Sequence, residues 1–332
     1  MRRRLPAFVL IVMAPLVAEL LGGSTPLDQP IALAFLLPIY LPLYGAGALL
    51  IRELVRRSGH GWASILLLGA AYGFVEEGLV SQSLFNPSLY HAADYGARFL
   101  GINGIFTELV IIVHAVWSAG VPILLTDLLF PAQRNEPYLG RFGLIVTGVF
   151  YAFGVGLLWL VARTSFAAGY DASPILLGLT ALIIIALVVI ALGVLPRKTA
   201  RRMRESRAPS PWIVLLVIGV VGFIWHDALA LGRIQPAFAH WPLVLLLVLG
   251  TAALSIGIAW LVKCWSEMRG WNDLHLLALA GGALACHTLS GWLYIAHTLA
   301  ERVALSVLAL AMAGFLAWVA RRIQHNVSHS AG

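Results

Sequence analysis

SPILLGLTALIIIALVVIALGVLP, residues 173–196, is a run of mainly apolar side chains that contains no charged residue. A helix needs about 20 residues to cross a hydrocarbon core of roughly 30 Å, and this run is long enough. Only helices and closed barrels satisfy every backbone hydrogen bond in lipid, and a continuous apolar run is typical of a helix. The segment therefore predicts a transmembrane helix.

Segments of the same kind recur along the whole chain. The 332 residues are 60% hydrophobic and 11% charged, whereas soluble domains carry about 25% charged residues. We therefore predict an all-α fold, a polytopic transmembrane bundle of about ten helices with no soluble domain between them. The predicted spans cover residues 5–22, 30–54, 61–85, 104–131, 142–163, 173–196, 212–232, 240–263, 273–297 and 301–320.

The basic residues of the loops indicate the orientation, because Lys and Arg accumulate on the cytoplasmic side. With the N-terminus inside, most of the 22 Lys and Arg residues fall on that side. We therefore predict that both ends of the chain are cytoplasmic. Topology and anionic lipid explain the net charge of +7, so we expect the lipid bilayer, and not nucleic acid, as a partner. The predicted orientation places four basic residues on the outer side: Arg98, Arg163, Arg233 and Arg302.

The longest polar interruption predicts the domain organisation. Residues 197–211 form a basic cytoplasmic linker that contains Pro and Ser, a composition typical of a connecting segment. The linker divides the chain into a six-helix membrane region, residues 1–196, and a four-helix membrane region, residues 212–332.

Ionisable residues inside the spans are the candidates for chemistry, because each charged one costs about 2.5–3.5 kcal/mol at the centre of a membrane helix. At a rise of about 1.5 Å per residue, the carboxyls of the third span and the histidines of three other spans fall between the midplane and the outer half. One polar pocket could therefore gather them. Glu19, Glu108 and Asp127 fall nearer span ends, where an interfacial position is the alternative.

The third span contains the densest group of candidates, in GAAYGFVEEGLVSQSLFNP, residues 69–87. Gly69 and Gly73 predict that a neighbouring helix approaches closely. Glu76 and Glu77 point about 100° apart on a helix, so we expect one to meet a histidine and the other an arginine, a hydroxyl group or water. Such a pair suits proton handling. The alternative is that both carboxyls only bond backbone or hydroxyl groups of neighbouring helices.

Histidines of other spans are the expected partners of these carboxyls. Ser118 lies four residues after His114 and shares its side of the helix. His226, which precedes Asp227, and His287 lie at a similar depth. A structural role with satisfied hydrogen bonds stays open for all three histidines, because buried titratable groups mark functional sites only in a fraction of cases.

The Glu-Glu segment resembles the Glu-Glu-x-x-x-Arg helix of the CPBP family, the CAAX-protease and bacteriocin-processing intramembrane proteins. By its spacing after Glu77, His114 resembles the histidine of that family's second motif, Phe-x-x-x-His. The resemblance implies that Glu76 or Glu77 activates water and that His114 holds the water or the oxyanion. Ser81 stands where the family has Arg, and Val110 stands where it has Phe.

Two further aspects of this resemblance concern the rest of the chain. No histidine follows at the distance of the family's third motif, and His226 and His287 are the remaining buried candidates. The Glu-Glu stretch is also similar to uncharacterised actinobacterial membrane proteins, which implies a bacterial cytoplasmic membrane and no particular activity.

Three functions are compatible with these residues. In an intramembrane hydrolase, a glutamate would activate water beside a histidine, and the substrate would be a membrane-embedded peptide. In a proton-coupled transporter, the same groups would relay protons for a small solute. In a non-catalytic membrane assembly protein, the polar core would be structural. The sequence identifies no cofactor and leaves metal binding open. The primary candidates are Glu76, Glu77 and His114, and the secondary candidates are His226, Asp227, His287, Ser118 and Glu108.

Overall fold

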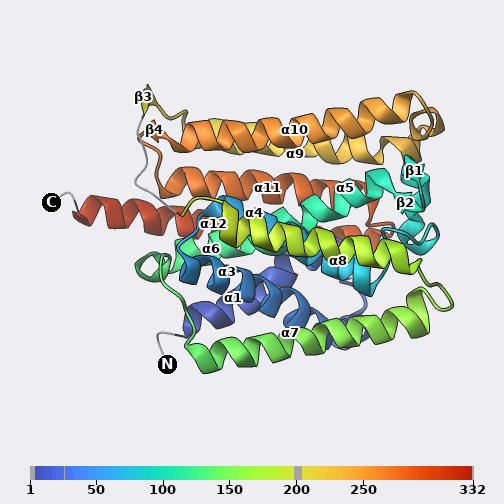
Figure 1. Ribbon diagram of the computed structural model, residues 1–332. Coiled ribbons are helices and arrows are strands. Elements are labelled where there is room, and N and C mark those ends of the chain that lie inside the picture. Colours follow the sequence, from blue (N-terminus) through green and yellow to red (C-terminus); the bar gives the residue numbers. More distant parts are fainter. Residues whose placement is uncertain (1–3, 26, 198–203, 331–332) are drawn as a thin grey trace.

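A computed structural model describes residues 4–25, 27–197 and 204–330 of the chain. The described residues form a bundle of long helices that run along a common direction (Figure 1). This arrangement confirms the predicted all-α fold. Some of the basic residues that were assigned to cytoplasmic segments lie outside the described residues: Arg2, Arg3, Lys198, Arg201 and Arg202.

Within the described residues, nine helices are long and apolar enough to cross a membrane, and Leu5–Leu20 is a shorter apolar helix. Together they correspond to the ten predicted spans. In chain order the helical elements are α1 (Leu5–Pro15) with η1 (Leu16–Leu20), α2 (Pro30–Tyr40) with η2 (Leu41–Gly45) and α3 (Ala46–Ser58), α4 (Trp62–Gly73) with η3 (Phe74–Val80), α5 (Gly104–Val113) with η5 (His114–Gly120) and α6 (Val121–Leu129), α7 (Arg141–Val161) with η7 (Ala162–Phe166), α8 (Pro174–Val189) with η8 (Ile190–Val194), α9 (Pro211–Ile234), α10 (Leu243–Ser266), α11 (Asp273–Tyr294) and α12 (Leu299–Ser330).

Short elements occupy the described loops at both ends of the bundle. Strands β1 (Arg98–Phe99) and β2 (Ile102–Asn103) form an antiparallel pair, whereas β3 (Arg204–Arg207) pairs in parallel with β4 (Met268–Arg269). The loops also contain the 3₁₀ turns η4 (Leu89–Tyr95), η6 (Pro131–Gln133) and η9 (Pro236–Ala239).

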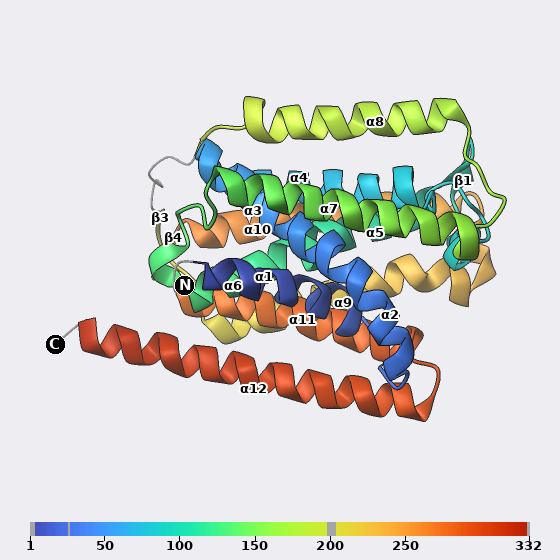
Figure 2. The same ribbon diagram turned by 90° about the horizontal axis from the view of Figure 1, so that it is seen from below.

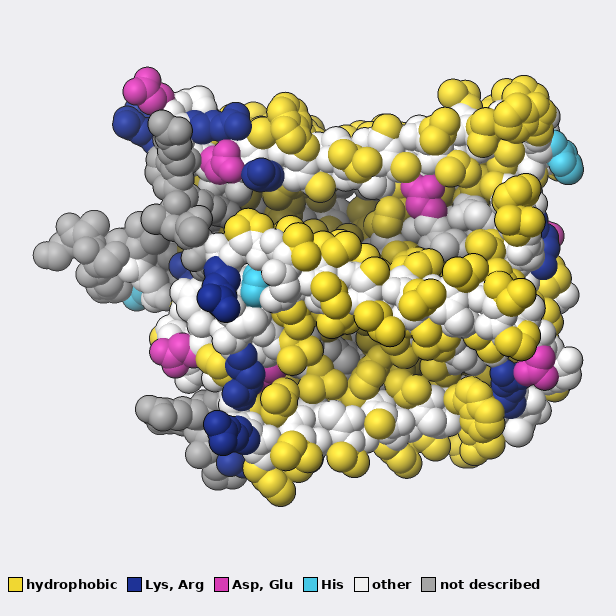
Figure 3. Space-filling view, viewed as in Figure 1, with side chains coloured by type: hydrophobic (Ala, Val, Ile, Leu, Met, Phe, Trp, Pro, Cys, Tyr) yellow, Lys and Arg dark blue, Asp and Glu magenta, His cyan; other side chains and the backbone are white. Residues whose placement is uncertain are grey.

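The beginning of α1 and the end of α12 lie at the same end of the bundle in two perpendicular views (Figures 1 and 2). In the space-filling view, Lys and Arg gather mainly at this end, and hydrophobic side chains cover the long sides (Figure 3). The positive-inside rule assigns the basic end to the cytoplasm. The described ends of the chain therefore lie together at the basic end of the bundle, as the predicted topology requires, and the cytoplasmic location of this end stays a prediction.

The helices divide into an inner group and a lipid-facing group. In the most apolar part of the span Gly104–Leu129, 67% of the residues are buried, whereas the value is 11% for both Arg141–Phe166 and Pro174–Val194. The apolar run of residues 173–196 therefore forms a peripheral helix, because lipid takes the place that other protein segments would take in a soluble fold. The inner helices carry the polar residues of the membrane interior.

The two predicted membrane regions share one hydrophobic core. Met13 and Trp117 of the first region lie in the same cluster of buried residues as Val214, Trp225 and Leu277 of the second. The division into residues 1–196, 197–211 and 212–332 stays a prediction, and residues 198–203 of the linker lie outside the described part of the chain.

Four π-helical turns interrupt the inner helices: η1, η2, η3 and η5. Such turns are rare and occur frequently at functional sites, because the inserted residue changes where side chains point. In η2, Pro42 follows Pro38 of α2, and a proline inside a helix removes one backbone donor. Each of the four turns contributes a polar side chain to the region described next.

Candidate intramembrane acid–base site

A close contact between α4 and η5 brings the Glu-Glu segment to His114. A Cβ atom at Gly69 would lie 2.8 Å from Ala115 Cα, and one at Gly73 would lie 3.0 Å from His114 Cβ. Larger side chains at these two positions would push the helices apart. The predicted close approach of a neighbouring helix at Gly69 and Gly73 is therefore confirmed.

This contact predicts a marked effect of adding one methyl group. Gly69→Ala should lower the free energy of unfolding by about 1–3 kcal/mol, the usual cost of overpacking. The matched control is Gly148→Ala on α7, where a Cβ would meet no atom within 4 Å. Thermal unfolding of the purified protein in detergent checks both variants. Equal melting temperatures for the two would contradict the tight contact.

His114 lies between the two carboxyls of η3. Its Nε2 is 3.2 Å from Glu77 Oε1, and its Nδ1 is 3.8 Å from Glu76 Oε2. Its Nδ1 also lies 3.0 Å from the hydroxyl of Ser118. All three members of the Glu-Glu-His group are buried. The structure thus brings together the three primary candidates, and it places Ser118 beside them.

Glu77 has hydrogen-bond partners on both of its oxygens. Oε1 contacts His114, and Oε2 accepts hydrogen bonds from Ser81, at 3.0 Å, and from Ser83. The serine at the position of the CPBP arginine therefore binds the carboxyl directly. With its oxygens occupied, Glu77 is suited to fix the ring of His114 rather than to react.

Glu76 differs from Glu77 because one of its oxygens is free. Oε1 accepts a hydrogen bond of 2.6 Å from the hydroxyl of Tyr44. Oε2 is buried and makes no hydrogen bond of normal length in the described structure, and the same is true of the Tyr72 hydroxyl, although Oε2 lies 3.8 Å from His114 Nδ1 and Tyr72 is near enough to interact with Glu76. A buried polar atom without a partner costs about 1–3 kcal/mol. The free oxygen of Glu76 therefore marks the position where a proton or a polar ligand atom would be accepted.

Two tyrosine rings enclose the imidazole of His114. The ring of Tyr44 stacks on it with centroids 6.1 Å apart, and the ring of Tyr72 packs edge-on at 5.4 Å. The side chains of Glu76, Glu77 and His114 are all buried, so a substrate would have to separate helices in order to reach them.

The same three residues are the metal-binding candidates of the described chain. Glu76, Glu77 and His114 each offer one ligand atom, and these atoms lie within 4.8 Å of one another. An ion there would replace hydrogen bonds that now hold Glu77 and His114. The hydrogen bonds account for the present geometry without an ion, so the identity of any cofactor stays open.

The prediction of one pocket for all the intramembrane histidines is wrong. His287 Nε2 lies 3.3 Å from the carbonyl oxygen of Ala18, and His226 Nδ1 lies 3.0 Å from that of Gly222. Both rings pack against Trp117. His226 and His287 therefore form a second group around Trp117, and in the described structure their hydrogen bonds go to backbone carbonyls and not to the carboxyls of η3.

The remaining secondary candidates also lie apart from the Glu-Glu-His group. The hydroxyl of Tyr294 donates a hydrogen bond to Asp227 Oδ1. Glu108 interacts with Thr251 across α5 and α10, and its Oε1 is buried without a partner in the described chain. Neither residue contacts the carboxyls of η3 in the described structure.

Two residues of the site were not predicted from the sequence. Neither is among the primary or secondary candidates named above: Glu19 has an interfacial position as its alternative, and the sequence does not single out Tyr44. The Tyr44 hydroxyl lies 2.5 Å from Glu19 Oε1 and 2.6 Å from Glu76 Oε1, so it connects Glu19 to the site. The sequence contains no signal for this contact, since it depends on how three helices are rotated.

Comparison with known proteins adds the family to this description. The model of an uncharacterized membrane protein family matches residues 8–324. No curated protein and no solved structure matches the chain. The resemblance to the CPBP family therefore stays a prediction that rests on the site residues.

Proposed function

This chain belongs to that uncharacterized membrane protein family, and from the site itself we propose that it is a glutamate-dependent intramembrane hydrolase. Glu76 is the general base, His114 binds the developing oxyanion, and Glu77 positions His114. The substrate class is a membrane-embedded peptide, because the reacting groups lie inside the spans. We further propose the bacterial cytoplasmic membrane as its location.

One observation carries this proposal: a carboxylate oxygen without a hydrogen bond lies near an imidazole whose Nε2 is held by a second carboxyl. Glu76 Oε2 accepts no hydrogen bond in the described structure and lies 3.8 Å from His114 Nδ1, while Glu77 holds Nε2 and Ser118 contacts Nδ1. A general base needs an accessible lone pair within reach of its water, and a preorganised donor lowers the cost of the negative charge that develops. Glu76 and His114 meet these two requirements.

The reaction follows from these roles. Glu76 Oε2 takes a proton from a water molecule as the water oxygen forms a bond to the substrate's carbonyl carbon. Nδ1 of His114, which contacts Ser118 in this structure, then donates a hydrogen bond to the carbonyl oxygen, on which negative charge develops. When the carbon–nitrogen bond breaks, Glu76 returns its proton to the leaving nitrogen. The products are a carboxylic acid and an amine.

A proton-coupled transporter is the second candidate. The hydrogen bonds from Glu76 through Tyr44 to Glu19 favour it, because carboxyls linked by a hydroxyl group are suited to proton relays in transporters. Solute uptake in vesicles that stops when the pH gradient is collapsed would support this function. A purely structural core is less compatible with the site, because it predicts fully paired carboxyls and Glu76 Oε2 has no partner in the described chain.

The test of the hydrolase requires no identified substrate. Membranes from cells that express the wild-type chain or Glu76→Gln are compared by mass spectrometry of new N-terminal peptides. We expect cleavage products within or next to transmembrane segments that depend on Glu76 and persist in Glu136→Gln, a change in an exposed loop. Identical peptide profiles for wild type and Glu76→Gln at equal expression would refute the hydrolase.

A further inference from the structure

We propose that Tyr44, Glu19 and Thr25 form a proton relay that connects Glu76 to the outer face of the membrane. This relay rests on the proposed role of Glu76 as the proton acceptor, and it adds the route by which the site exchanges protons with water. Three observations support it: a shared hydroxyl group, a continuous set of hydrogen bonds, and a surface pocket at the far end.

The first observation is the position of the Tyr44 hydroxyl between two carboxyls. It lies 2.5 Å from Glu19 Oε1 and 2.6 Å from Glu76 Oε1. A phenol has one hydrogen to donate, and an ionised carboxylate can only accept. Both contacts are hydrogen bonds only when one of the two carboxyls carries a proton and donates it to the phenol oxygen. The geometry therefore implies one proton that Glu19 and Glu76 share through Tyr44.

The second observation is that the hydrogen bonds continue beyond Glu19. The hydroxyl of Thr25 lies 3.4 Å from Glu19 Oε2 and 2.9 Å from the hydroxyl of Tyr40. Thr25 is buried. Each group between Glu76 and Thr25 thus has one partner on the side of the site and another on the side of the loop, as a relay by successive proton transfers requires.

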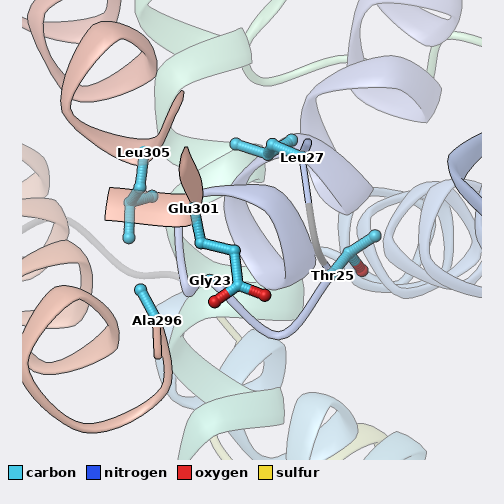
Figure 4. A pocket seen from close by; sticks show the side chains of 6 residues that line it. All are labelled: Gly23, Thr25, Leu27, Ala296, Glu301 and Leu305. Atoms are coloured by element: carbon cyan, nitrogen blue, oxygen red, sulfur yellow. The ribbon is translucent and has the colours of Figure 1, made fainter. Parts of the chain in front are cut away.

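The third observation is a small pocket at the end of this path. Gly23, Thr25 and Glu301 are among the residues that line it, and the side chain of Glu301 points toward the loop that carries Gly23 and Thr25 (Figure 4). This loop lies beside the beginning of α12, at the end of the bundle opposite the described chain ends (Figure 2). By the topology derived above, the path opens on the outer side.

Such a path lets the site restore its protonation state after turnover. Hydrolysis gives a carboxylic acid and an amine, and no net proton is released when the proton of the acid passes to the amine. When the amine leaves uncharged, the proton of the new acid passes to Glu76 Oε2, after which both carboxyls are protonated. Glu19 then releases one proton from Oε2 to Thr25, whose own hydroxyl hydrogen moves on to water in the pocket. The pair returns to one shared proton, so the site is ready for another turnover.

The shared proton is testable by infrared spectroscopy of the purified, lipid-reconstituted protein without any substrate. We expect the spectrum of the wild-type protein to contain the carbonyl stretch of a protonated carboxylic acid. This band should shift in the spectrum of Tyr44→Phe, because the hydrogen bond with the phenol is lost. It should weaken or vanish in both Glu19→Gln and Glu76→Gln, and it should still respond to Tyr44→Phe in the Glu108→Gln background. A carboxylic acid band that Tyr44→Phe leaves unchanged would overturn the proposal.

The route to the outer face is tested by the rate at which this acid proton exchanges in D₂O. Thr25→Val, which keeps the shape but lacks the hydroxyl group, should slow the exchange several-fold, and Thr25→Ser should exchange at the wild-type rate. Equal rates for valine and serine would refute the route. Because neither readout requires cleavage, an intact relay in a protein without hydrolase products would refute the hydrolase and leave the relay standing.

Discussion

Replacing Glu76 with glutamine should reduce peptide cleavage by about 10²- to 10⁴-fold, the usual contribution of a general base. Glutamine keeps the size of the side chain and can still accept the hydrogen bond from Tyr44, but its amide cannot take a proton from water. The effect should appear in kcat, because the lost interaction belongs to the transition state. Initial cleavage rates in proteoliposomes, with a substrate identified by the N-terminal peptide comparison, provide the measurement.

Glu77→Gln separates the roles of the two adjacent carboxyls. Glu77 already bonds His114, Ser81 and Ser83, so its replacement should displace the imidazole and reduce kcat less than Glu76→Gln does. The double variant should be no slower than Glu76→Gln alone, because residues that act as one unit are not additive. Full activity of Glu76→Gln together with an inactive Glu77→Gln would reverse the assignment.

Replacing Arg52 with alanine should lower the free energy of unfolding by about 3–5 kcal/mol, because it leaves buried partners without their cation. The guanidinium of Arg52 is fully buried. It bonds Asp127 Oδ1 at 2.9 Å and the carbonyl oxygens of Gln133, Arg134 and Glu136 at 3.0–3.1 Å. The hydrogen bonds of this one side chain therefore hold the loop after α6 against α3.

Asp127 completes this ion network near the end of α6, the end of the span where it was predicted. It is buried and binds Arg52 and Arg56. Burial and the neighbouring Asp127 carboxylate raise the pKa of Tyr138, so the hydroxyl of Tyr138 keeps its proton and donates it to Asp127 Oδ1 at 3.0 Å. The aspartate thus has partners on all sides.

Thermal and chemical unfolding in detergent measure the predicted loss. Arg52→Lys should recover only part of the stability, because an ammonium group cannot reproduce the planar fork of hydrogen bonds. Arg141→Ala, at an exposed position, should change stability by no more than about 0.5 kcal/mol. The network would have no such role if Arg52→Ala melted at the same temperature as Arg141→Ala.

The spans and their orientation could be predicted from the sequence because apolar length and loop charge act locally along the chain. The meeting of one carboxyl of the Glu-Glu pair with a histidine could also be predicted, since Gly69 and Gly73 indicate a close helix pair and charged groups in lipid need partners. The positions of Glu19, His226 and His287 could not. Each depends on the rotation of a whole helix, and the π turns change that rotation by amounts that periodicity does not reveal.

The order in which the site residues occur along the chain has a consequence for biogenesis. Glu19, Tyr44, Glu76 and His114 come from the first four membrane helices in turn, and His114 lies in Gly104–Leu129. Every group that reacts in the proposed mechanism is therefore synthesised before α7. Until the fourth helix enters the bilayer, Glu76 and Glu77 lack their contact with the imidazole of His114. We therefore expect the third helix to stay beside the translocon until the fourth helix is inserted.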